Sequence, residues 1–179
     1  ELCLTDRGEK YLDLPGEIQI RKIYQDLEIS YKKQLSKIWN NKKNNILEYK
    51  LLLCREEKYP CLGIKIKSQK YELSPAAFVE CLKNKEKKQA YLDYDKLVLP
   101  LKIRNRRKGD RFKPLNCNYF KKIKSYFIDL KVPLHERDNV LFLADKLNRI
   151  VWIVGYQIDD RFKVAQQSKE ALNIKILNL

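Results

Sequence analysis

The sequence lacks methionine altogether and contains little glycine or histidine. Its 179 residues include five glycines, each isolated from the others, and one histidine, His135. A loop that cradles phosphates needs several glycines close together, so the sequence excludes such a loop. A serine–histidine–aspartate triad would have to use His135, which lies in a Pro-Leu-His-Glu-Arg stretch typical of a helix start. The residues by themselves therefore predict no catalytic group.

Cysteine spacing indicates neither a metal site nor a disulfide framework. Five cysteines are scattered along the chain, none of them in a Cys-x-x-Cys pair. Asp159 and Asp160 could offer oxygen ligands to a hard cation, but adjacent carboxylates point in different directions, which favours a solvated turn. We therefore expect no metal site, and we expect reduced thiols in a cytoplasmic protein.

Long apolar runs are also missing. The longest runs from Ile150 to Tyr156, includes a glycine, and is far too short to cross a membrane. Residues 1–10 are mostly polar, without the apolar core of a secretory signal. Because the chain starts at Glu1 and has no methionine, we expect it to be a piece of a longer protein. Apolar residues make up 44% of the sequence, which predicts a folded chain rather than a disordered one.

Positive charge dominates what is present. The chain has 38 Lys and Arg against 23 Asp and Glu, a formal net charge of +15. Abundant Lys, Ile and Asn are typical of an AT-rich genome, so part of this excess can be compositional. Clustering argues for a function, because residues 101–131 hold 11 basic side chains and two acidic ones. Four of the ten arginines fall between Arg104 and Arg111, which predicts a polyanionic partner such as nucleic acid.

Alternation of apolar and polar residues predicts a strand-rich α+β fold with two or three short helices. Ser74 followed by Pro75 indicates the start of one helix. Strands are expected at residues 18–20, 27–31, 46–54, 61–67, 97–104, 140–144, 149–156 and 174–177. Those at 46–54 and 61–67 are expected to pair with each other.

A second helix is predicted after Asn118, with lysines near its start. Its expected apolar face, spaced by three and four residues, consists of Phe120, Ile123, Phe127 and Leu130. Positive charge near a helix start opposes the helix dipole, a cost that an anionic partner would offset. The alternative is that these lysines are ordinary exposed positions of an amphipathic helix.

We predict that the clustered cations form one face against nucleic-acid phosphates, because the planar fork of arginine can bind phosphate through two hydrogen bonds. If the strand continues, alternation turns Arg107 away from its neighbours. Arg111 could instead be structural and pair with Asp110 or Asp129. The predicted RNA-binding residues are Arg104, Arg106, Arg107, Lys108, Arg111, Lys113, Lys121, Lys122, Lys124, Lys131 and Arg137.

An ordered set of short motifs resembles the C-terminal domain of bacterial tRNA(Ile)-lysidine synthetase. The motifs are Leu101-Lys-Ile-Arg-Asn-Arg-Arg-Lys-Gly-Asp-Arg-Phe-Lys-Pro-Leu115, Lys121-Lys-Ile-Lys124, Phe127-Ile-Asp129, Lys131-Val-Pro133, Arg137-Asp138, Ile150-Val-Trp-Ile-Val-Gly-Tyr156 and Asp160-Arg-Phe162. The opening from Leu14 to Arg21 is similar to the linker hairpin after that enzyme's helical substrate-binding domain. The chain departs from the family at Asn116-Cys-Asn-Tyr119, where glycines are usual, and at Val140 or Leu141, where a proline is common.

Three parts are expected along the chain. From the strand-dominated pattern, residues 15–179 should pack as one β-rich body with two sub-regions, joined near Asp93 to Leu97, after a stub of helix at 1–13. With the resemblance, residues 1–14 would end a preceding helical domain or linker, residues 15–96 would form a β-rich first sub-region, and residues 97–179 would form the lysidine-synthetase-type C-terminal domain.

The resemblance also implies a function for the parent enzyme, which would use ATP and magnesium to ligate lysine to the wobble cytidine of tRNA(Ile). The ATP-binding Ser-Gly-Gly-x-Asp-Ser loop of that family has no match here, so this piece should bind no cofactor and have no ligase activity. Its implied task is to hold tRNA(Ile) at the acceptor stem. No membrane partner is expected, and a homodimer of the parent stays open.

Two alternative functions from other classes of protein also stay open. One is a stand-alone nucleic-acid-binding module, and the other is a protein-interaction domain whose charge is compositional. A salt titration of RNA binding separates the protein-interaction domain from both RNA-binding readings.

Overall fold

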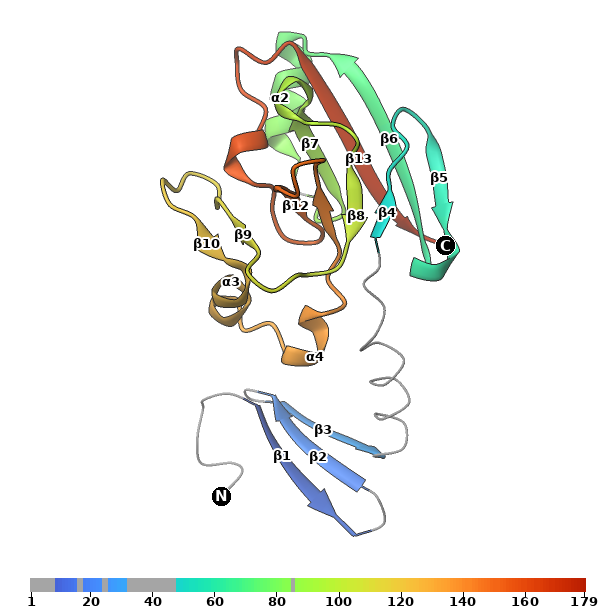
Figure 1. Ribbon diagram of the computed structural model, residues 1–179, viewed down its shortest axis with the longest axis vertical. Helices are drawn as coiled ribbons and strands as arrows, with labels where there is room; N and C mark the ends of the chain where they lie inside the picture. The colour runs from blue at the N-terminus through green and yellow to red at the C-terminus, as the bar shows by residue number, and fades with distance from the viewer. Residues whose placement is uncertain (1–8, 16–17, 24–25, 32–47, 85) are drawn as a thin grey trace. The chain divides into compact units, whose positions relative to one another are not determined.

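The structure, a computed structural model, describes residues 9–15, 18–23, 26–31, 48–84 and 86–179 (Figure 1). The chain divides into two compact units, so the expectation that residues 15–179 pack as one body is wrong. One comprises Glu1–Ile46 and Phe127–Asp138, and the other Leu47–Tyr126 and Asn139–Leu179. Strands outnumber helices in the described part, which confirms the α+β prediction. None of its helices is long and apolar enough to span a bilayer.

The first unit contains a three-stranded antiparallel sheet in the order β1-β2-β3. Its strands are β1 (Glu9–Leu14), β2 (Ile18–Ile23) and β3 (Asp26–Tyr31). The predicted helix stub is wrong for residues 9–13, because they pair in register with β2, from Glu9 opposite Ile23 to Leu14 opposite Ile18. Strand pairing supplies hydrogen-bond partners that stabilise this segment, whereas a helix so short is marginal by itself. Residues 1–8 lie outside the described part.

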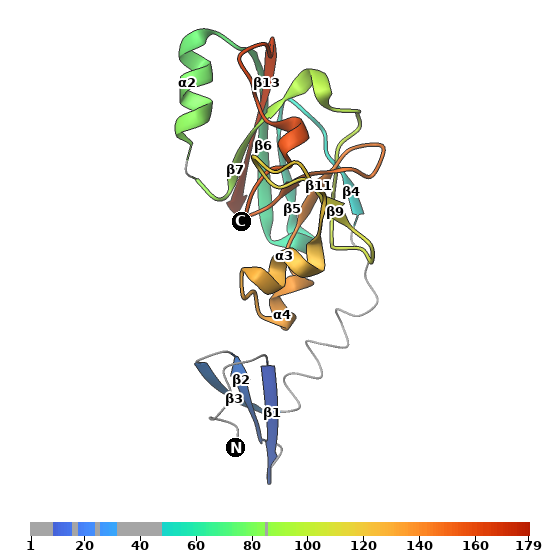
Figure 2. The same ribbon diagram turned by 90° about the vertical axis from the view of Figure 1, so that its left-hand side faces the viewer.

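The second unit is built on two four-stranded antiparallel sheets. The first has the order β12-β11-β8-β4, with bounds Ile150–Ile153, Phe142–Ala144, Lys102–Arg104 and Glu48–Lys50. The second has the order β5-β6-β13-β7, with bounds Glu56–Tyr59, Ile64–Glu72, Glu170–Asn178 and Gln89–Asp93. Figure 2 shows strands of both sheets in a view turned by 90° from that of Figure 1.

Each of these sheets contains strands from both sides of the predicted boundary at residues 96 and 97. Strand β8 pairs with β4, and β13 lies between β6 and β7 (Figure 1). That boundary therefore does not separate two sheets, and the division into 15–96 and 97–179 stays a prediction. The expected pairing of 46–54 with 61–67 is wrong, because β4 takes β8 as its partner.

One hydrophobic core joins the two sheets of the second unit. Its fully buried side chains include Leu101, Ile103 and Trp152 from or beside the first sheet, and Ile66, Leu92 and Leu172 from the second. Burial of such side chains stabilises the fold by about 1.5–3 kcal/mol each. The loops at the edge of this core are thereby held in place.

Helix α2 (Pro75–Lys83) confirms the helix predicted after Ser74. The Ser74 hydroxyl accepts a hydrogen bond from the Ala77 backbone N–H at 3.2 Å, as an N-cap does. Shorter elements complete the described part: 3-10 turns η1 (Pro60–Leu62), η2 (Tyr94–Lys96) and η3 (Asp160–Phe162), strands β9 (Arg111–Phe112) and β10 (Lys121–Lys122), and helices α3 (Ile123–Asp129) and α4 (Leu134–Arg137).

The helix predicted from Asn118 starts later than expected. Residues Lys121–Lys122 pair with β9 as strand β10, and α3 begins only at Ile123. Of the expected apolar face, Ile123 and Phe127 are buried, whereas Phe120 and Leu130 are exposed. The capping role expected of Asn118 is therefore wrong, because strand pairing takes the residues that would have formed the first helical turn.

Candidate nucleic-acid interface

The β9–β10 ribbon places two cations directly opposite each other. Arg111 pairs across the ribbon with Lys122, and Phe112 pairs with Lys121. Successive side chains of a strand point to opposite faces, so the burial of Phe112 turns Arg111 outward. Like charges opposite each other on a ribbon are destabilising unless something compensates them. This exposed pair therefore favours an anion.

More cations of the predicted set are exposed. The exposed members in the second unit are Lys108, Arg111, Lys122 and Lys124, while Lys131 is exposed in the first unit. Arg106 and Lys121 are half-buried. Of the exposed members, the structure places Arg111 and Lys122 side by side, across the β9–β10 ribbon.

Arg104 differs from these residues because its side chain is only 1% exposed. Its guanidinium donates two hydrogen bonds to the Asp110 carboxylate, Nη1 to Oδ2 at 2.9 Å and Nη2 to Oδ1 at 3.0 Å. Asp110 Oδ2 also accepts from the Arg107 backbone N–H at 2.8 Å. Arg104, and not Arg111, therefore holds this turn together, and the prediction that Arg104 contacts phosphate has no support in the geometry.

The Arg107 side chain also binds other side chains of the protein. Its guanidinium forms an ion pair with the Glu48 carboxylate and donates to Asn148 Oδ1 at 3.3 Å. Glu48 additionally binds Lys102 Nζ at 2.6 Å, and the hydrogen bond from Lys102 holds the pKa of that carboxyl below its usual range. A phosphate would have to compete with Glu48 for Arg107.

Arg137 is the second buried arginine of the predicted set. Its Nε donates to the Val132 carbonyl at 2.8 Å, so it stabilises the segment around α4 rather than facing solvent. Its expected contact with RNA is not supported. Lys113 is half-buried, and its Nζ lies 3.7 Å from Asp160 Oδ2.

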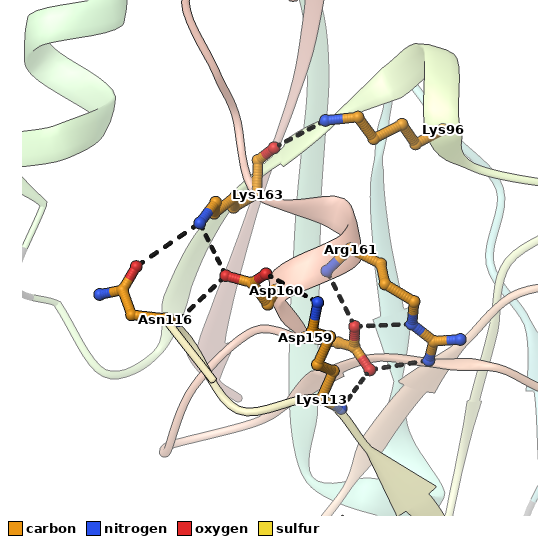
Figure 3. A network of polar contacts seen from close by, with 7 residues as sticks. All are labelled: Lys96, Lys113, Asn116, Asp159, Asp160, Arg161 and Lys163. Atoms are coloured by element: carbon orange, nitrogen blue, oxygen red, sulfur yellow. Dashed lines mark hydrogen bonds and ion pairs between the residues drawn. The ribbon is translucent and has the colours of Figure 1, made fainter. Parts of the chain in front are cut away.

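Asp159, which caps the start of η3, and Asp160, its first residue, form a network of polar contacts rather than a solvated turn (Figure 3). Asp159 is fully buried and accepts from the Lys113 backbone N–H at 2.8 Å and from Arg161 Nε and Nη2 at 2.8 and 2.7 Å. Asp160 accepts from Lys163 Nζ at 2.7 Å and from the Asn116 backbone N–H at 3.0 Å. Both carboxylates therefore attach the segment at 113–116 to η3.

The electrostatics of Asp160 agree with its structural role. The hydrogen bond from Lys163 lowers the pKa of Asp160 below its ordinary value. Among the residues that the structure describes, no group of three or more His, Cys, Asp or Glu side chains could hold a metal ion.

Exposed aromatic side chains next to the lysines were not among the predicted site residues. Tyr119 is 57% exposed and Phe120 is 54% exposed, immediately before Lys121 and Lys122. The guanidinium of Arg161 lies over the Phe120 ring, 4.9 Å from its centroid. Aromatic residues next to lysines are a signal of nucleic-acid binding, but the helical spacing of Phe120 assigned it to a buried face.

Comparisons with known proteins agree with the resemblance found in the sequence. Residues 101–175 match the family described as TilS substrate C-terminal domain. The tRNA(Ile)-lysidine synthase of Clostridium tetani is 32% identical over 179 residues, which cover 93% of this chain and 34% of that protein. That of Caldanaerobacter subterraneus is 34% identical over 165 residues, covering 92% of this chain and 32% of the relative. The chain thus spans about a third of the length of these relatives.

A solved structure shares the fold. The crystal structure of a TILS C-terminal domain superposes with a TM-score of 0.61 and 24% sequence identity, covering 75% of this chain and 98% of that one.

Proposed function

We propose that this chain is the tRNA-binding part of a tRNA(Ile)-lysidine synthase, because residues 101–175 match the TilS substrate C-terminal domain family and almost the whole chain is similar to such enzymes. The parent enzyme would ligate lysine to the wobble cytidine of tRNA(Ile) with ATP and magnesium. We propose that the parent enzyme is located in the cytoplasm. The free thiols of Cys54, Cys61, Cys81 and Cys117 support this, because cytoplasmic proteins keep their cysteines reduced.

The residues that the structure describes do not fit an ATP or magnesium site. The sequence has no glycine-rich phosphate loop, and the described part has no cluster of metal-binding side chains. We therefore assign no step of the ligation to this chain, and its proposed role is to hold the tRNA.

The observation that carries the proposal is the exposed pair of Arg111 and Lys122 on the β9–β10 ribbon. A-form RNA is recognised mainly through its phosphates, its shape and its 2′-hydroxyl groups rather than through base edges. Exposed cations on a short ribbon suit that kind of contact, and Lys108 and Lys124 are further exposed cations close to it in sequence. We propose the tRNA acceptor stem as the duplex, contacted mainly by Lys108, Arg111, Lys122 and Lys124.

The remaining predicted residues have different roles in this proposal. Arg106, Lys113 and Lys121 are kept as further phosphate contacts of the second unit, and Lys131 is kept as a phosphate contact of the first unit. Arg107 is kept as a contact shared with Glu48. Arg104 and Arg137 are left out, because both are buried and donate hydrogen bonds to the protein.

The test is a binding titration of the chain with three RNAs at several salt concentrations. We expect tRNA(Ile) and a minihelix of its acceptor stem to bind with similar affinity, and the anticodon stem–loop to bind more weakly. A steep fall of affinity with salt is expected, because phosphate contacts release counterions. Weak, salt-insensitive binding to all three RNAs would instead support a protein-interaction domain.

A further inference from the structure

We infer that Phe120 is a stacking platform for an unpaired base of the bound RNA. The inference rests on the proposed function and adds to it a specific contact with a single-stranded nucleotide. It starts from the position of the ring, which is 54% exposed on the segment just before β10. An exposed aromatic ring beside lysines is the combination with which proteins bind single-stranded nucleic acid, since bases stack on the ring and the cations contact the backbone.

The Phe120 ring lies against a cation that the protein holds in place. Arg161 lies with its guanidinium carbon 4.9 Å from the Phe120 centroid and 5.4 Å from that of the buried Phe162. The buried carboxylate of Asp159 holds this guanidinium through Nε and Nη2, at 2.8 and 2.7 Å (Figure 3). The Arg161 guanidinium therefore has a fixed position before RNA binds, which lowers the entropy cost of binding.

The same aspartate also anchors the segment that carries the ring. Asp159 Oδ2 accepts the hydrogen bond from the Lys113 backbone N–H at 2.8 Å, where the segment leaves β9. Strand β10 fixes its other end through the pairing of Lys121 with Phe112. Asp159 is thus a positioning residue that acts through Arg161 and the segment 113–120.

The residues around Phe120 favour binding of an unpaired nucleotide over a paired one. Lys122 follows Phe120 by two residues and lies opposite Arg111, so one RNA strand can contact these cations with phosphates and the ring with a base. Bases inside a duplex are already stacked on their neighbours, so only an unpaired base is available to the ring. On an acceptor stem, the unpaired 3′ nucleotides continue directly from the duplex. The base that stacks on Phe120 is therefore one of these nucleotides.

The experiment compares two RNAs that differ only in the unpaired nucleotides. One is an acceptor-stem minihelix with its 3′ single-stranded tail, and the other is the same duplex with a blunt end. We expect the chain to bind the tailed RNA more tightly. Phe120→Ala should weaken binding of the tailed RNA by roughly 5- to 100-fold and leave the blunt duplex unchanged, since stacking on one aromatic ring contributes about that factor. Phe120→Trp should retain the preference.

A fluorescence measurement reports on stacking itself. With 2-aminopurine in the tail, binding of the unsubstituted chain should quench its emission, and binding of the Phe120→Ala variant should not. Tyr119→Ala is the matched control, because Tyr119 is a neighbouring aromatic residue with similar exposure. It should retain both the preference and the quenching.

Three results would overturn the inference: an unchanged affinity of Phe120→Ala for the tailed RNA, an equal loss for both RNAs, or loss of the preference in Tyr119→Ala. Circular dichroism and urea unfolding of each variant establish that it is folded as the unsubstituted chain is. Failure of the proposed function looks different, because the unsubstituted chain would then bind neither RNA.

Discussion

Arg104 and Asp110, six residues apart in the most basic segment of the chain, form a two-point ion pair with nitrogen–oxygen distances of 2.9 and 3.0 Å. Arg104 is buried, whereas Arg111, next to Asp110 in sequence, is exposed. The arginine cluster therefore contains both a structural residue and candidates for RNA contact, and substitutions can separate the two roles.

Arg104→Ala should lower the free energy of unfolding by about 3–5 kcal/mol, because it leaves the partly buried Asp110 carboxylate without its partner. Urea unfolding followed by circular dichroism measures this. Lys108→Ala is the control, and its free energy of unfolding should change by less than about 0.5 kcal/mol, because Lys108 is exposed. A similar small change for both variants would contradict the structural role of Arg104.

Replacing Arg111, Lys122 and Lys124 together by alanine should weaken tRNA binding and reduce the slope of log affinity against log salt by about two to three. Folding should barely change, because exposed cations contribute little to stability. Replacing the exposed Lys67, Lys146 and Lys169 removes the same charge elsewhere and is the control. If both triple variants lose the same affinity and slope, binding depends on net charge and not on the β9–β10 ribbon.

Asp159→Asn should destabilise the chain by about 3–5 kcal/mol, because the buried Asp159 carboxylate pairs with Arg161 and accepts the Lys113 backbone N–H. It should also abolish the preference for tailed RNA by releasing Arg161 from its place behind Phe120. Asp160→Asn, next to it but partly exposed, should cost less stability and keep the preference. Urea unfolding and the two-RNA titration measure these effects, and a preference that survives in folded Asp159→Asn would speak against a positioning role.

The Asp160–Lys163 pair should make stability depend on pH in the acid range. The pKa of Asp160 is lowered in the folded chain, so its contribution is complete above the ordinary value of about 4 and is lost as the pH falls through the lower folded value. We expect the urea midpoint to fall less steeply for Asp160→Asn than for the unsubstituted chain as the pH is lowered from 5 to below about 4. Parallel curves for the two proteins would show that the pair contributes nothing.

The purified chain should show no lysidine formation with ATP, magnesium, lysine and tRNA(Ile), because it has no glycine-rich phosphate loop. Mass spectrometry of nucleosides from the treated tRNA detects the product. The complete enzyme of a relative, assayed in parallel, is the positive control, and lysidine formed by this chain alone would contradict the proposal.

Local signals in the sequence were sufficient for several elements. Ser74 and Pro75 start α2 because capping and proline geometry act within one turn, and the β11–β12 hairpin joins neighbouring segments. The strand-rich α+β class and the basic character of residues 101–131 could likewise be predicted, since alternation and charge are properties of the residues themselves.

Partners distant in sequence could not be predicted in this way. The pairing of Lys121–Lys122 with β9 moved the start of α3 and left Phe120 exposed, although its spacing fits a helical face. Asp159 contacts Lys113 from 46 residues away, and Phe120 lies under Arg161. The sequence by itself determined the charge, the class and the resemblance to the TilS C-terminal domain. Only the tertiary structure decided which arginines are buried and which cations face solvent, because burial depends on contacts between segments that sequence separation does not specify.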